Sequence, residues 1–105
     1  MRILFDQGTP LPLRDHILRH SVATVFELGW SNLENVKLLA AAEASFDLMV
    51  TTDQQIRYQQ NLRGRRLAII VLLTTSWPRI KMHIPQIQDV IENIKPGDYQ
   101  EILLR

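Results

Sequence analysis

The sequence contains no cysteine, and this absence excludes disulfide bonds, zinc–thiolate centres and thiol catalysis from its 105 residues. Long apolar runs are missing as well, since no segment approaches the roughly 20 residues that a membrane span needs. The first residues, with Arg2 and Asp6 among them, do not resemble a secretory signal. We therefore expect a cytoplasmic protein that does not enter the membrane, and the lack of cysteine fits a reducing compartment.

The sequence also lacks an excess of charge of one sign, because 12 basic residues stand against 11 acidic ones. No overall basic field for nucleic acid results from this balance. One segment is nevertheless basic: Arg57, Arg63, Arg65 and Arg66 lie within ten residues that contain no acid. A chain of this length and composition predicts one soluble globular domain.

Segments typical of strands and helices alternate along almost the whole chain. Short apolar segments predict strands over residues 3–5, 21–25, 48–51 and 67–73, with an edge strand over 98–104. Apolar residues at helical spacing predict helices over residues 12–20, 32–45 and from Ser76 to residue 94, the last kinked or divided at Pro85. This alternation predicts an α/β domain with a mostly parallel sheet and helices on both faces.

Two serines mark expected helix starts. Ser31 and Glu34 have the spacing of a capping box, in which the serine accepts from an amide three residues on and the glutamate reaches back. Ser76 can cap the last helix, with Pro78 tolerated in its first turn.

Polar residues follow two of the predicted strands. Asp6 comes directly after the first strand, and Asp53 follows the strand that ends at residue 51. In a parallel sheet, strand carboxyl ends and helix amino ends share one edge, so Asn35 in the first turn of the second helix belongs to the same edge. Two carboxylates and an amide oxygen suit Mg²⁺ or Mn²⁺, which could activate water for attack on a phosphodiester.

The alternative is that each aspartate is only a turn or capping residue, and that Asn35 only satisfies local backbone groups. Glu43 is left out of the site, because eight residues beyond Asn35 correspond to about 12 Å along a helix.

The segment from Thr52 to Arg66 is expected to be a long polar loop, with a helical turn or two between Gln54 and Gln60. Its arginines could follow an RNA backbone while Tyr58 stacks on a base. A solvated arginine-rich loop before a buried strand is the other interpretation.

Three motifs together resemble PIN-like domains: the strand that ends in Asp6, the helix segment Asn35–Ala42, and the run Val50–Ile56. The likeness spans most of the chain and is greatest for the short stand-alone bacterial group related to toxins of toxin–antitoxin pairs. The resemblance implies a ribonuclease whose clustered acids hold Mg²⁺ or Mn²⁺. Asp6 and Asp53 match family acids, whereas Asn35 and Gln55 stand where further acids are expected.

The sequence thus predicts an RNA-cleaving toxin component, with Asp6 and Asp53 as metal ligands and an antitoxin protein as a possible partner. Asn35 and Gln55 would orient water or metal, and Thr52 would position the loop. Arg57 and residues 63–66 would hold RNA. The competing hypothesis is a catalytically weak or inactive PIN-like module that binds RNA or a protein, since replacing a carboxylate by an amide removes charge that a hard cation needs. A third is an oligomerisation domain, such as a homodimer, that uses the last helix and edge strand.

Overall fold

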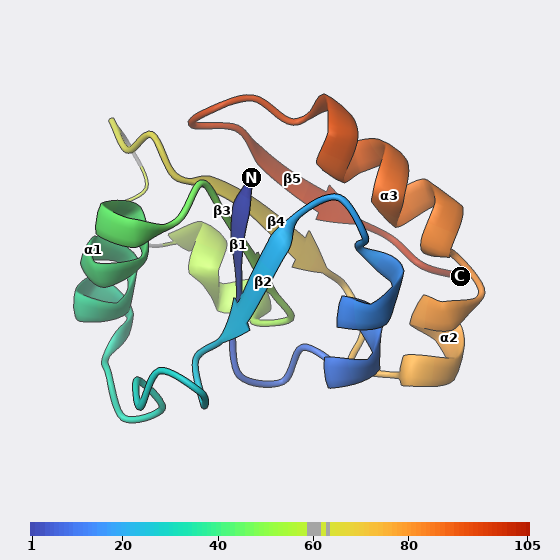
Figure 1. Ribbon diagram of the computed structural model, residues 1–105, viewed down its shortest axis with the longest axis horizontal. Helices are drawn as coiled ribbons and strands as arrows, with labels where there is room; N and C mark the ends of the chain where they lie inside the picture. The colour runs from blue at the N-terminus through green and yellow to red at the C-terminus, as the bar shows by residue number, and fades with distance from the viewer. Residues whose placement is uncertain (59–61, 63) are drawn as a thin grey trace.

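The computed structural model describes residues 1–58, 62 and 64–105, and its centre is a five-stranded parallel sheet (Figure 1). The strands lie in the order β2-β1-β3-β4-β5, and each neighbouring pair is parallel. In chain order the elements are β1 (Arg2–Phe5), η1 (Leu11–His16), β2 (Ser21–Thr24), α1 (Asn35–Ser45), β3 (Leu48–Thr51), η2 (Gln54–Tyr58), β4 (Ala68–Leu72), α2 (Trp77–Lys81), α3 (Ile84–Asn93) and β5 (Tyr99–Ile102). The predicted α/β class is confirmed.

Helices cover both faces of this sheet, as expected. One face packs against η1, α2 and α3, and the other packs against α1 and η2 (Figure 1). Alternate residues of the central strands supply the two cores: Leu48 and Val50 of β3 point to the first face, whereas Met49 points to the second. β3 and β4 are buried along their whole length, because neighbouring strands and both helical layers cover them.

The predicted helix over residues 12–20 is wrong in type and extent. Leu11–His16 forms a 3₁₀ helix, and Ile17 leaves it with φ −114° while its side chain is buried in the core. At 6 residues it exceeds the roughly three or four that are usual for a 3₁₀ helix. Burial of Leu13 and Ile17 against the sheet therefore overrides the local helical pattern.

The capping-box prediction is also wrong. α1 begins at Asn35, its N-cap is Glu34, and none of the described side chains caps it. Residues before the helix form a turn in which the Leu33 amide donates to the Trp30 carbonyl at 3.0 Å. Because Trp30 and Leu33 pack against the core in this turn, Ser31 and Asn32 stay outside the helix.

The last helical segment is divided as predicted. α2 begins after Ser76, whose Oγ accepts from the Arg79 amide at 3.4 Å, and α3 carries Pro85 in its first turn. The break between α2 and α3 falls at residues 82–83, directly before Pro85. Among the described residues, no helix is long and apolar enough to cross a bilayer.

Candidate active site

The strand order places a topological switch point between β1 and β3. The connection that leaves β1 passes over one face through η1, and the connection that leaves β3 enters η2 on the other face (Figure 1). The two connections diverge at the carboxyl ends of β1 and β3, which is where open α/β sheets bind their ligands. Asp6 is the residue after β1, and Asp53 is the second residue after β3. Both carboxylates therefore flank the switch point.

Thr51, the last residue of β3, joins the two aspartates. Its hydroxyl donates to Asp6 Oδ2 at 2.7 Å and accepts from the Asp53 amide at 3.1 Å. Thr51 is fully buried and is the only buried polar side chain among the described residues. Thr51 shares with Met49 the face of β3 that packs against α1, so its hydroxyl links the Asp6 carboxylate and the Asp53 amide on that side of the sheet.

The loops after β1 and β3 are packed tightly against each other. The Asp6 amide and the Thr9 hydroxyl both donate to the Val50 carbonyl, at 2.9 and 3.1 Å. Gly8 lies between them with φ +92°, and a Cβ atom there would approach Thr52 Oγ1 to 2.8 Å. The turn that carries Asp6 therefore has little freedom to move away from β3.

Burial raises the pKa of the Asp6 carboxyl above its ordinary value, and the nearby charge of Asp53 raises it further. Hydrogen bonds from the Thr51 hydroxyl and the Gln7 amide act in the opposite direction. A divalent cation near both carboxylates would offset this like charge. Carboxylate oxygens are also the ligands that Mg²⁺ and Mn²⁺ prefer, so Asp6 and Asp53 fit such a cation.

No third acid or histidine of the described part of the chain joins Asp6 and Asp53 in a group that could hold a metal ion. Asn35 is the first residue of α1 and lies partly exposed at the same edge of the sheet. Gln55 lies in η2, where its backbone amide donates to Asp53 Oδ1 at 2.9 Å. The Gln55 contact orients the Asp53 carboxylate through the backbone.

Arg57 and Tyr58 are the last two residues of η2, which begins directly after Asp53. The Arg57 guanidinium packs over the Tyr58 ring at 4.9 Å from its centroid and donates to the Tyr58 hydroxyl at 2.9 Å. Arg57 also pairs with Glu101 of β5 at 3.5 Å, and Glu101 accepts from the Tyr99 hydroxyl. Burial, this hydrogen bond and the Glu101 charge raise the pKa of Tyr99, with a smaller contribution from Asp53. Arg57, Tyr58, Tyr99 and Glu101 thus form a polar cluster beside Asp53.

Arg65 and Arg66 of the predicted RNA-binding segment lie away from Arg57. Arg65 pairs with Glu43 at 2.6 Å, and the Arg66 amide donates to the same carboxylate at 2.8 Å. These contacts precede β4 and occur near the end of α1, at the amino edge of the parallel sheet. Arg65 and Arg66 are therefore separated from Arg57 by the length of the sheet, and Arg63 lies outside the described residues. The geometry also agrees with leaving Glu43 out of the site.

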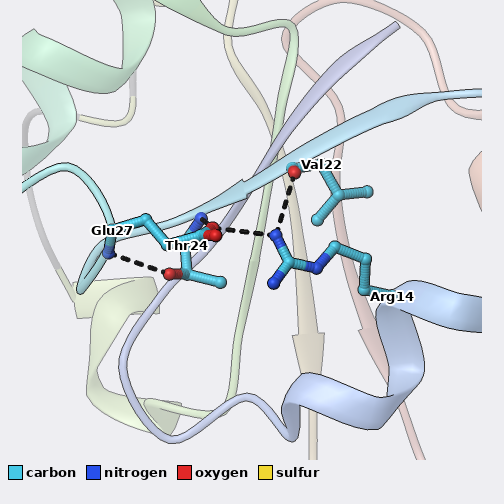
Figure 2. A network of polar contacts seen from close by, with 4 residues as sticks. All are labelled: Arg14, Val22, Thr24 and Glu27. Carbon is cyan, nitrogen blue, oxygen red and sulfur yellow. Dashed lines mark hydrogen bonds and ion pairs between the residues drawn. The ribbon is translucent and has the colours of Figure 1, made fainter.

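A pocket of about 440 Å³ adjoins Asp6 on the side away from β3. The turn after β1, residues of η1 and the turn after β2 line it, and Leu11, Arg14 and Phe26 are among these residues. Figure 2 shows how one wall is held: Arg14 donates to the Val22 carbonyl at 3.4 Å and to Glu27 Oε1 at 2.8 Å. Glu27 also accepts from the Thr24 amide at 2.9 Å.

These contacts also cover the free edge of the sheet at β2. The amides of Ser21 and Val25 point to β1, so the backbone groups of Val22 and Thr24 point outward. Arg14 and Glu27 satisfy one of these outward groups each. The ion pair therefore protects an edge that would otherwise be open to another strand.

Sequence reasoning missed Thr51, Thr9 and the pocket beside Asp6. The sequence did carry a signal for Thr51. It is the last residue of a predicted strand, on the same face as Met49, and the adjacent predicted strand leads into Asp6. The Arg14–Glu27 pair had no such signal, since the two residues are 13 positions apart and meet only after η1 folds back on β2.

Comparisons of the chain with protein-family models, with curated proteins and with solved structures gave no match.

Proposed function

We propose that this protein is a Mg²⁺- or Mn²⁺-dependent ribonuclease of the PIN-like type, acting in the cytoplasm as the toxin component of a toxin–antitoxin pair. The observation that carries the proposal is the Thr51 hydroxyl, which joins the Asp6 carboxylate to the backbone amide of Asp53 at the switch point of a parallel sheet. The fold is consistent with it, and so is the raised pKa of Asp6, which reflects a burial and a like charge that a bound cation would offset.

In this proposal Asp6 and Asp53 hold the cation. When bound, Mg²⁺ or Mn²⁺ supplies an activated water and stabilises negative charge on a phosphodiester. Thr51 keeps the Asp6 carboxylate in place through its 2.7 Å hydrogen bond, and Gly8 lets the Asp6 turn approach Thr52 closely.

Other residues at the carboxyl edge of the sheet orient water and RNA. Asn35 and the side chain of Gln55 offer amide groups that orient water, while the Gln55 backbone holds Asp53. Arg57 and Tyr58 provide a cation and an exposed ring for RNA on the η2 side. We restrict the RNA contact to these two residues, because Arg65 and Arg66, held near Glu43 by the Arg65 guanidinium and the Arg66 amide, lie at the other edge of the sheet.

The proposal is tested by Mn²⁺-dependent cleavage of a fluorescent single-stranded RNA by the wild type, Asp6→Asn and Asp53→Asn. Loss of at least 100-fold in rate is expected for each variant, since removing a ligand charge weakens a hard-cation site. Asp15→Asn is the matched control, because Asp15 is an exposed acid in η1 outside the site. Cleavage that is unchanged in both site variants would refute the assignment.

A binding module without strong catalysis is the second candidate. It is favoured by Asn35 and Gln55, which are amides at positions where the PIN-like resemblance implies acids, and by the lack of a third acid grouped with Asp6 and Asp53 among the described residues. Calorimetry distinguishes the two: absence of Mn²⁺ binding together with retained RNA or protein binding supports the module.

The partner surfaces proposed are the carboxyl edge of the sheet for RNA and the open edge of β5 for an antitoxin or a second copy of the chain. The amide of Ile69 donates to Asp98 and that of Leu73 to Ile102, so Tyr99 and Glu101 direct their backbone groups outward. None of the described strands covers this edge, in contrast to the sealed edge of β2. Sedimentation that shows only monomer would rule out self-association through β5.

A further inference from the structure

We propose that the pocket beside Asp6 binds one unstacked nucleobase of single-stranded RNA, next to the phosphate that the aspartates act on. This inference rests on the proposed function, whose substrate it specifies. Its supports are an exposed aromatic ring on a rigid turn, the charge of the pocket lining, and the size of the pocket.

The first support is Phe26, which lines the pocket and is 84% exposed. Its turn is held from several sides. The Glu27 amide donates to Thr24 Oγ1 at 3.0 Å, the Leu28 amide donates to the Thr24 carbonyl at 3.2 Å, and Arg14 holds the Glu27 carboxylate (Figure 2). These contacts hold the turn in which the Phe26 ring is exposed to solvent. A fixed exposed ring offers a stacking surface at low entropic cost.

The second support is charge. The lining contains one arginine, Arg14, and two carboxylates, Asp6 and Glu27. Arg14 is already engaged by Glu27 and the Val22 carbonyl, so a phosphate would meet no available cation in this pocket. An uncharged planar base avoids that conflict. The phosphate of the same nucleotide then belongs at the adjoining Asp6–Asp53 site.

The third support is size and chemistry. A volume of about 440 Å³ lies within the roughly 300–1,000 Å³ typical of small-molecule pockets. Leu11, 53% exposed, adds apolar surface from η1, and the side-chain amide of Gln7 offers a donor and an acceptor for a base edge. The pocket therefore offers apolar surface for a planar base together with the uncharged Gln7 amide, which could read a base edge.

Titration with adenosine and with uridine, followed by amide chemical shifts, tests the pocket without metal or phosphate. Shifts at Gln7, Phe26 and Glu27 in the wild type are expected, and Phe26→Ala should abolish them. Leu28→Ala is the control, because Leu28 is a partly exposed apolar residue of the same turn that does not line the pocket. Phe26→Trp should restore or strengthen binding, since a larger ring stacks at least as well.

Single-stranded RNA provides the second measurement. Its affinity in the presence of Mn²⁺ should fall about 5- to 150-fold in Phe26→Ala, the range that loss of one stacked base produces. Leu28→Ala should leave it unchanged. RNA affinity that does not depend on residue 26, or displacement of adenosine by N-acetylphenylalaninamide at lower concentration than by uridine, would overturn the inference. The latter result would indicate a pocket for a protein side chain.

The two proposals fail separately. If nucleoside binding depends on Phe26 while Mn²⁺ is not bound and RNA is not cleaved, the base pocket stands and the nuclease does not. If cleavage depends on Asp53 while Phe26→Ala binds nucleosides and RNA like the wild type, the nuclease stands and the base pocket does not.

Discussion

At the scale of single residues, Thr51 links the two aspartates, although it carries no charge itself. Its one hydroxyl is both donor to Asp6 and acceptor for the Asp53 amide, and it is fully buried. A hydroxyl in this position has no water to replace a lost partner. The geometry of the site therefore depends on a residue outside any metal-ligand motif.

Thr51→Val tests this dependence. Valine keeps the shape but removes both hydrogen bonds, so the free energy of unfolding should fall by about 1–3 kcal/mol, the usual cost of leaving buried partners unsatisfied. Mn²⁺ affinity should fall as well, because Asp6 loses the donor that holds it. Thr51→Ser, which retains the hydroxyl, is the control for denaturant unfolding and Mn²⁺ calorimetry. Equal stability and Mn²⁺ affinity in the valine and serine variants would contradict this role.

Gly8 makes a second residue-scale prediction. Gly8→Ala combines an unfavourable positive φ with a Cβ contact of 2.8 Å to Thr52 Oγ1, so we expect a loss of about 1–3 kcal/mol in unfolding free energy. Gly29→Ala has a similar φ of +72° with no described atom within 4 Å of the added Cβ, and should cost less. Thermal unfolding of both variants measures the difference. A larger loss for Gly29→Ala would show that the two loops are not tightly packed.

The raised pKa of Asp6 predicts a pH dependence with a definite sign. Because the folded state takes up the Asp6 proton at higher pH than the unfolded chain, this residue adds stability below 3.8 that is lost as pH rises through its folded-state pKa. The wild type should therefore gain stability relative to Asp6→Asn as pH falls toward 3.8. Urea unfolding of the two proteins at several pH values measures this. A stability difference that is the same at neutral and acid pH would refute it.

At the scale of elements, Glu43 ties the end of α1 to the segment before β4 through Arg65 and the Arg66 amide. The Arg66 amide and the Arg65 guanidinium lower the pKa of the Glu43 carboxyl. The sign is opposite to that of Asp6: the stabilisation is present above the ordinary carboxyl pKa of 4.5 and is lost as pH falls below it.

Glu43→Gln should therefore lower the melting temperature at neutral pH, and the difference from the wild type should shrink as pH falls through the Glu43 pKa. Glu34→Gln is the control, because Glu34 is exposed at the opposite end of the same helix. A difference that persists unchanged at low pH would mean that the ion pair is not responsible.

The local sequence pattern predicted the bounds of some elements and not of others. Residues 48–51 were predicted as a strand with the observed bounds, since a buried parallel strand is apolar throughout. The capping box at Ser31 failed because packing of Trp30 and Leu33 decides where α1 begins. Capping chemistry is worth about 1 kcal/mol, which burial of two large side chains exceeds.

At the scale of the whole molecule, the alternation of elements predicted the α/β class and the shared edge of Asp6 and Asp53. It did not predict the strand order, which creates the switch point between β1 and β3. Nor did it predict that Arg57 and Arg65 lie at opposite edges of the sheet. Contacts between residues far apart in the chain decide these features, and a local pattern carries no information on them.

The central claim is that Asp6 and Asp53 form one cation site at this switch point. Its most direct test is calorimetric titration of the wild type, Asp6→Asn and Asp53→Asn with Mn²⁺, with Asp15→Asn as the control. We predict one Mn²⁺ per chain in the wild type and in the control, and an affinity at least tenfold weaker in each site variant. A wild type that binds no Mn²⁺, or two site variants that bind it as tightly as the wild type, would contradict the claim.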